Sequence, residues 1–136
     1  MSARSKARKA ALDFLYESDI RGKSASALLE SRKNDLEYLI RDYTGFLVSG
    51  IEAKRSRIDE IIAMRAKDWD LDRMPVVDRN ILRVGAFEIL WAVNLPEEVA
   101  ISESVELAKT LSTEDSATYI NGVLAAIRDI KGELVL

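Results

Sequence analysis

The chain has 136 residues, of which 48% are hydrophobic and 32% are charged, and its net charge is −3. It contains no cysteine and no histidine, which excludes disulfides, thiolate nucleophiles, imidazole general bases and the common zinc sites. Its length is typical of one domain, residues 1–136, and it lacks a membrane-length apolar run and a secretory signal, as expected for a cytoplasmic protein.

The first predicted helix, residues 3–20, is basic at its beginning. Four basic residues give the first twelve positions a charge of +4 and leave −7 for the rest of the chain: Arg4, Lys6, Arg8 and Lys9. Arg4 and Arg8 lie one helical turn apart, so they share a face, and Tyr16 follows further along it. Cations beside an aromatic ring can hold a phosphate and stack a base. The alternative is a solvated basic terminus, with Tyr16 half buried beside the core.

Gly22 predicts the end of this first helix, because glycine readily adopts the left-handed conformation of a helix cap. Ser24 or Ser26 then begins a short second helix that continues through residues 27–29. Both serines have a side-chain oxygen that can accept a bond from a free backbone N–H at a helix start.

The next helix is predicted from a capping pattern. Asn34, followed by Glu37 three residues later, has the spacing of a capping box and predicts a long helix over residues 36–51. Gly45 and Gly50 lie inside this segment, and each is unfavourable for a helix by about 1 kcal/mol. They therefore indicate close packing of a neighbouring helix or a bend.

A basic junction over residues 54–57 leads into a further short helix over 58–67, and Trp69 follows where its ring can cover the end of the core. The longest apolar segment comes next and predicts a helix from Pro75 to Val93. Two overlapping apolar stripes indicate that this central helix is buried on more than one side. Charges crowd into its first two turns and can form a docking edge: Asp78, Arg79 and Arg83.

The remaining elements follow the turn at Pro96. A helix is predicted over residues 100–111, and hydroxyl caps followed by carboxylates restart a helix at 112–116. The last helix carries an apolar stripe and ends at Gly132. No strand pattern or internal repeat occurs, so the predicted fold class is all-α, a single compact bundle of about seven helices.

The chain offers no recognisable active site. Its carboxylates do not pair with a base or a metal-ligand partner, and it has no glycine-rich phosphate loop. Glu88 is the one acid set among apolar residues of the central helix. We interpret it as a structural carboxylate satisfied by Arg83, another basic residue or backbone N–H groups, with a buried catalytic acid as the alternative. The protein is therefore predicted not to be an enzyme.

Three blocks of sequence resemble the NusB family closely, in the same order along nearly the whole chain. They are Ala7-Arg8-x-x-Ala11-Leu12-x-x-Leu15-Tyr16; Asp78-Arg79-x-Ile81-Leu82-Arg83 followed by Phe87-Glu88-Ile89-Leu90; and Val99-Ala100-Ile101-Ser102-Glu103-Ser104-Val105-Glu106-Leu107-Ala108-Lys109 with Asp115-Ser116 and Tyr119-Ile120-Asn121-Gly122-Val123-Leu124. The resemblance implies an all-helical transcription antitermination protein. Such a protein binds boxA RNA of ribosomal RNA operons together with the ribosomal protein NusE. It reaches RNA polymerase through other Nus factors, some members form homodimers, and the family has no catalysis and no cofactor.

The resemblance also implies roles for particular residues. The RNA-contacting arm of the family corresponds to the basic N-terminal segment, so the expected phosphate contacts are Arg4, Lys6, Arg8 and Lys9. Tyr16 and Tyr119 match family aromatics that can stack a splayed base, and Asp115 matches an acid beside the RNA, where it limits affinity. The charged end of the central helix falls in the region presented to NusE: Asp72, Asp78 and Arg79.

Two other functions remain as alternatives. One is a NusB-like helical interaction domain accessory to an RNA-modifying enzyme, since such domains occur fused to an RNA cytosine methyltransferase. A chain that stops at Leu136 leaves no room for a cofactor-binding domain and has no cysteine to attack a base. The other is a helical interaction protein without an RNA role, which the basic arm and the two tyrosines disfavour.

Overall fold

The computed structural model describes residues 1–35, 39–67 and 69–136, and within these ranges it contains seven α-helices and no β-strand. The helices are α1 (Ala3–Arg21), α2 (Ala25–Lys33), α3 (Asp42–Ala53), α4 (Arg55–Arg65), α5 (Val76–Trp91), α6 (Glu97–Leu111) and α7 (Glu114–Ile130). Two short 3-10 helices complete the description, η1 (Leu71–Arg73) and η2 (Lys131–Glu133). The predicted all-α fold class is confirmed. No described helix is both long and apolar enough to cross a membrane.

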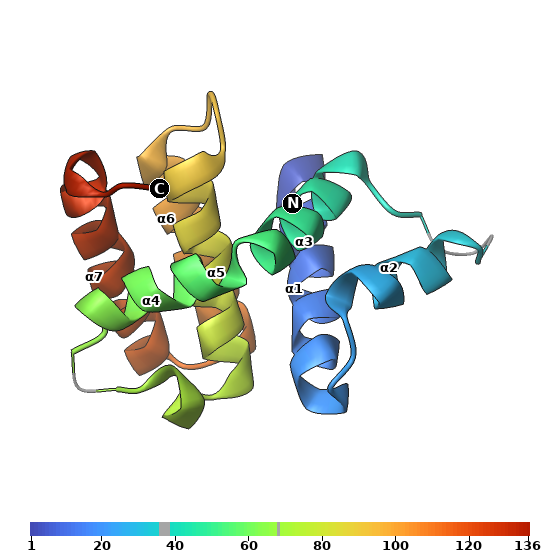
Figure 1. The fold of residues 1–136 in the computed structure, drawn as a ribbon, viewed down its shortest axis with the longest axis horizontal. Coiled ribbons are helices and arrows are strands. Elements are labelled where there is room, and N and C mark those ends of the chain that lie inside the picture. Colours follow the sequence, from blue (N-terminus) through green and yellow to red (C-terminus); the bar gives the residue numbers. More distant parts are fainter. Residues whose placement is uncertain (36–38, 68) are drawn as a thin grey trace.

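α5 is the central helix of the fold. Figure 1 shows α1, α2 and α3 on one side of the molecule and α4 to α7 on the other, with α5 in contact with α1, α3, α4, α6 and α7. Every residue from 80 to 90 is buried, which confirms the prediction of a helix buried on more than one side. Pro75 is the residue before the helix rather than its first residue. The helix ends at Trp91, since Ala92 is already extended (φ −81°, ψ 106°), and Asn94 adopts a positive φ of 65° in the turn that follows.

The predicted helix ends are largely confirmed by hydrogen bonds. Gly22 has φ 66° and donates its N–H to Ser18 O at 2.9 Å, as a left-handed cap does. Of the two serines considered for α2, Ser24 is the cap and accepts from Ala27 N at 3.2 Å. The restart before α7 is capped by Thr113, whose hydroxyl oxygen accepts a bond from Ser116 N at 3.0 Å.

The start of α3 differs from the prediction. Asn34 caps the C-terminal end of α2 instead of beginning a new helix, and α3 begins only at Asp42. Residues 39–41 are not helical, and Glu37, the other half of the expected capping box, lies outside the described residues. A capping pattern is a local signal, and asparagine is suited to both ends of a helix. The prediction of a helix over 36–51 was therefore wrong in its cap at Asn34 and over residues 39–41.

Gly50 lies on α3 directly against the Phe87 ring of α5. A Cβ atom built on Gly50 would overlap the ring of Phe87, whose side chain is only 2% exposed. We expect Gly50→Ala to lower the free energy of unfolding by about 1–3 kcal/mol, because overpacking outweighs the gain in helix propensity. Gly45→Ala is the matched control in the same helix, because its added Cβ has no heavy atom within 4 Å apart from its chain neighbours and the adjacent backbone of α3. Urea unfolding of both variants measures the difference, and equal stabilities would contradict close packing at Gly50.

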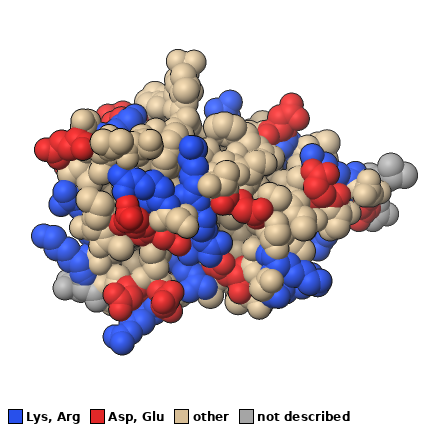
Figure 2. All heavy atoms as spheres, viewed as in Figure 1, with Lys and Arg blue, Asp and Glu red and all other residues tan. Residues whose placement is uncertain are grey.

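An ionic cluster fixes the end of α1 to α5. Asp19 Oδ2 accepts hydrogen bonds from Arg79 Nε at 3.0 Å, Asn80 Nδ2 at 3.0 Å and Arg83 Nη1 at 2.9 Å, and Arg55 reaches Oδ1 at 3.0 Å. Burial raises the pKa of Asp19, but the bond from Asn80 and the three arginines outweigh it and lower the pKa to about 2. Figure 2, in the same view as Figure 1, shows basic side chains with acidic ones beside them near the middle of this face, where α4 approaches the half of the molecule formed by α1, α2 and α3.

Candidate functional site

The basic residues of the first turns lie on α1 and differ in their surroundings. Arg4 is exposed, and its guanidinium lies 4.0 Å from the centre of the Tyr43 ring. Lys6 is exposed and forms no ion pair with a described residue. Lys9 pairs with Asp13 one turn further along, at 2.7 Å, and both side chains remain partly exposed. These three side chains can reach a phosphate without breaking a buried contact.

Arg8 is not accessible in the same way, and the prediction that it contacts a phosphate is corrected. The side chain is 2% exposed, and Nε donates to both oxygens of Glu88 at 2.9 Å. Glu103 lies 3.5 Å from Nη1, and the hydroxyl of Tyr43 donates to the same Glu88 carboxylate. Burial, followed by this bond to Glu88, raises the pKa of Tyr43. Arg8 is thus a structural residue of the core, and it is the basic partner expected for Glu88, whereas Arg83 pairs with Asp19 and Asp59.

An aromatic pocket forms where α7 begins. Trp69 and Tyr119 lie with ring centres 5.7 Å apart, and the hollow beside them has a volume of about 440 Å³. The other residues that line it are Asp78, Thr113, Asp115 and Ser116. Trp69 is 47% exposed, so its ring faces solvent instead of closing the core as predicted. Sequence reasoning missed Trp69 as a site residue, because fifty positions separate it from Tyr119 and no local pattern pairs them.

Asp78 lines this pocket and does not lie on the exposed docking edge predicted for the central helix. Its side chain is 4% exposed, and Ser116 Oγ donates to Oδ2 at 2.6 Å. Oδ1 is buried and has no hydrogen-bond partner among the described residues. The predicted partner-binding edge is therefore corrected: the beginning of α7 covers Asp78, and Arg79 is held by Asp19 at 3.0 Å. Asp72, in η1, is the exposed member of the three.

The predicted RNA-contacting residues thus occupy three places. Arg4 and Arg8 meet over Tyr43, and Asp115 meets Tyr119 in the aromatic pocket. Tyr16 is 44% exposed and lines a separate hollow with Ile20, Arg32 and neighbouring residues. Tyr16 and Tyr119 therefore line different hollows of the surface. The geometry therefore supports an extended surface with several contact points rather than one compact site.

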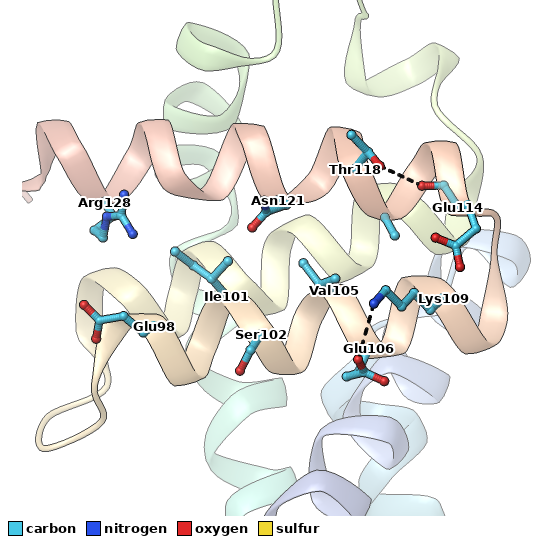
Figure 3. Close-up of a pocket in the computed structure, with 11 residues that line it drawn as sticks. Glu98, Ile101, Ser102, Val105, Glu106, Lys109, Glu114, Thr118, Asn121 and Arg128 are labelled. Carbon is cyan, nitrogen blue, oxygen red and sulfur yellow. Dashed lines mark hydrogen bonds and ion pairs between the residues drawn. The ribbon is translucent and has the colours of Figure 1, made fainter.

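The groove between α6 and α7 has no feature of a catalytic site. Figure 3 shows its charged residues spread along both helices, and its volume is about 480 Å³. Lys109 lies 3.7 Å from Glu106, and Thr118 donates to the backbone oxygen of Glu114 at 3.1 Å. The charges neither converge on one point nor surround a nucleophile. Over the ranges that the structure describes, no group of acidic residues has metal-ligand geometry.

Comparison with known proteins adds independent information. Residues 5–129 match the model of the NusB family. A transcription antitermination protein NusB of Streptomyces griseus is 45% identical, over 98% of this chain and 97% of that protein. One of Saccharopolyspora erythraea is 48% identical, over 98% and 92%. The solved structure of T. maritima NusB is 31% identical with a TM-score of 0.83, covering 98% of this chain and 99% of that one. NusB solved with NusE and dsRNA is 29% identical with a TM-score of 0.81, covering 93% and 96%.

Proposed function

This chain belongs to the NusB family of transcription antitermination factors, which are not enzymes, and we propose that it binds boxA-type single-stranded RNA together with NusE. In this role it promotes antitermination in ribosomal RNA operons, in the cytoplasm, as a single NusB-like domain over residues 1–136. The related structure of NusB with NusE and dsRNA supports RNA and NusE as the partners. Contact with RNA polymerase through other Nus factors, and a homodimer, belong to the same proposal.

The aromatic pocket is the observation that carries this proposal. Trp69 and Tyr119 offer two rings 5.7 Å apart, and an unpaired base can stack on either of them. Beside them, the buried Oδ1 of Asp78 lacks a hydrogen-bond partner among the described residues. A buried acceptor of this kind is costly unless a ligand satisfies it.

The phosphate contacts are assigned to three residues of α1: Arg4, Lys6 and Lys9. They are accessible and supply charge with little sequence information. Tyr16, which is 44% exposed on the same helix, is proposed as a further stacking ring. Asp115, exposed at the rim of the aromatic pocket, repels phosphate and limits affinity.

The NusE surface is proposed around Asp72 and Arg79, which remain at least partly accessible. Asp78 is not included, because its side chain is covered by α7. An acidic residue at this edge suits a ribosomal protein, which is usually basic. The proposed partner surface adjoins the aromatic pocket, because Arg79 directly follows the pocket residue Asp78 in α5.

Replacement of Tyr119 tests the pocket. We expect Tyr119→Leu to weaken binding of boxA-type RNA by roughly tenfold or more, because one stacked base contributes about 1–3 kcal/mol. Tyr119→Phe keeps the ring and serves as the matched control, with affinity close to that of the unmodified protein. Equilibrium titrations on boxA-type and scrambled RNA, with and without NusE, measure the change. If Tyr119→Leu binds as tightly as Tyr119→Phe, the pocket does not hold a base.

A further inference from the structure

A second set of aromatic rings lies away from the pocket, where α3 meets α5. Tyr43 and Phe46 are 5.6 Å apart, Phe46 and Phe87 5.4 Å, and Phe87 and Trp91 5.8 Å, measured between ring centres. We call these four residues the aromatic row. Phe87 is buried, but Phe46 is 45% exposed, and Tyr43 and Trp91 are partly exposed. The row therefore presents three rings at the surface, two from α3 and one from α5.

A cation lies over each end of the aromatic row. The Arg4 guanidinium is 4.0 Å from the centre of the Tyr43 ring, and Lys54 Nζ is 5.0 Å from the centre of the Trp91 ring. Both cations are exposed, and neither forms an ion pair with a carboxylate of the described residues. The chain has more acidic than basic residues, 23 against 20, and most of its arginines lie within reach of a carboxylate. Arg4 and Lys54 contact aromatic rings and no carboxylate of the described residues, so both charges are available to an anionic ligand.

Exposed rings flanked by cations are the features that proteins use to hold single-stranded nucleic acid. Bases stack on the rings, and the cations neutralise the phosphates between them. Bases in a duplex cannot reach such rings, because they are already stacked inside the helix. An acidic peptide is the competing ligand, but a stable protein interface needs about 800 Å² on each partner, much more than the exposed parts of three rings. Lys6 and Lys9 follow Arg4 on α1 and extend the basic surface, which favours RNA over an acidic peptide as the ligand.

We propose that the aromatic row is a second RNA-binding surface, which holds unpaired nucleotides flanking the segment bound at Trp69 and Tyr119. This inference rests on the proposed function and adds a contact that the pocket alone does not provide. Arg4 then covers the Tyr43 ring and also neutralises a phosphate at that end of the row. Lys54 covers the Trp91 ring and neutralises a phosphate at the other end.

The two tryptophans of the chain allow the two surfaces to be observed separately, because Trp69 belongs to the pocket and Trp91 to the row. Trp91→Phe leaves Trp69 as the reporter, and Trp69→Phe leaves Trp91. Each variant is titrated with a boxA-type RNA and with the same RNA extended by about ten unpaired nucleotides at either end, a length within the range of known single-strand sites. We expect the short RNA to change only Trp69 fluorescence, and one of the extended RNAs to change Trp91 fluorescence as well.

Variants of the row test whether the signal reflects binding. The extension should tighten binding by about tenfold in the unmodified protein and by less than twofold in Phe46→Ser and in Lys54→Gln. Lys23→Gln, an exposed lysine at the turn after α1, is the matched control and should keep the full gain. Circular dichroism checks that each variant is folded, and Lys54→Gln removes only an exposed charge. A Trp69 response without any Trp91 response overturns this inference and leaves the proposed function intact, whereas no response from either tryptophan overturns both.

Discussion

Glu88→Ala is expected to destabilise the fold by about 3–5 kcal/mol, a large part of the stability of a small domain. The Glu88 side chain is fully buried, and its partner Arg8 is 2% exposed. Burial lowers the pKa of Arg8, but its contacts with Glu88 outweigh this and raise it, so the guanidinium stays charged. Removal of the carboxylate would leave that charge buried without its main partner, and the Tyr43 hydroxyl would lose its acceptor. Urea unfolding followed by circular dichroism at pH 7 measures the loss.

The matched control is Glu106→Ala, which removes an equal side chain that is 69% exposed and lies 3.7 Å from Lys109. An exposed pair of this kind contributes little, so the control should stay within about 0.5 kcal/mol of the unmodified protein. A double variant, Arg8→Met with Glu88→Leu, should recover much of the stability, because it removes both charges and keeps the volume. A loss below about 1 kcal/mol in Glu88→Ala would contradict the structural role of the pair.

Asp19→Asn is expected to lower the free energy of unfolding at pH 7 by about 2–3 kcal/mol, since each unit of pKa shift corresponds to about 1.4 kcal/mol. The pKa of Asp19 falls from 3.8 to about 2 in the folded protein, and its side chain is 6% exposed. A lowered pKa means that the stabilisation is complete above pH 4 and is lost as the pH falls from 3.8 through 2. The difference between the two proteins should therefore shrink over that interval. Urea unfolding at a series of pH values from 7 to 2.5 measures it.

Asp13→Asn on the same helix is the control for the pH series. Its carboxylate is 58% exposed and pairs with Lys9, so neutralising it should cost little at any pH. A stability difference for Asp19→Asn that stays constant across the series would show that the cluster acts through shape rather than charge. Loss of the cluster would also loosen Arg83, which bridges Asp19 and Asp59 at 2.9 and 2.8 Å.

Helix ends with strong local signals were predicted well. Gly22, Ser24 and Thr113 each satisfy backbone groups within their own turn, so a few neighbouring residues decide the outcome. Asn34 shows where this reasoning fails. The same residue type can end one helix or begin the next, and the sequence around it satisfies either pattern.

The candidate site was predicted only in part, because burial depends on elements distant in the chain. Arg8 looks like its exposed neighbours Arg4 and Lys9, yet its partner Glu88 is 80 positions away. Asp78 looks like an exposed acid in a first turn, yet α7 covers it. Trp69 and Tyr119 form one pocket although nothing in either segment points to the other.

The amino-acid sequence by itself determined the all-α class, the buried central segment, the exclusion of cysteine and histidine chemistry and the resemblance to the NusB family. These features follow from composition, from apolar periodicity and from residue order, all of which are local or additive. Only the tertiary structure decided which charges are buried, why Gly50 is packed and Gly45 is free, and which rings face solvent. The physical reason is that periodicity shows which face of a helix is buried, whereas the neighbour on that face depends on how all the helices pack together.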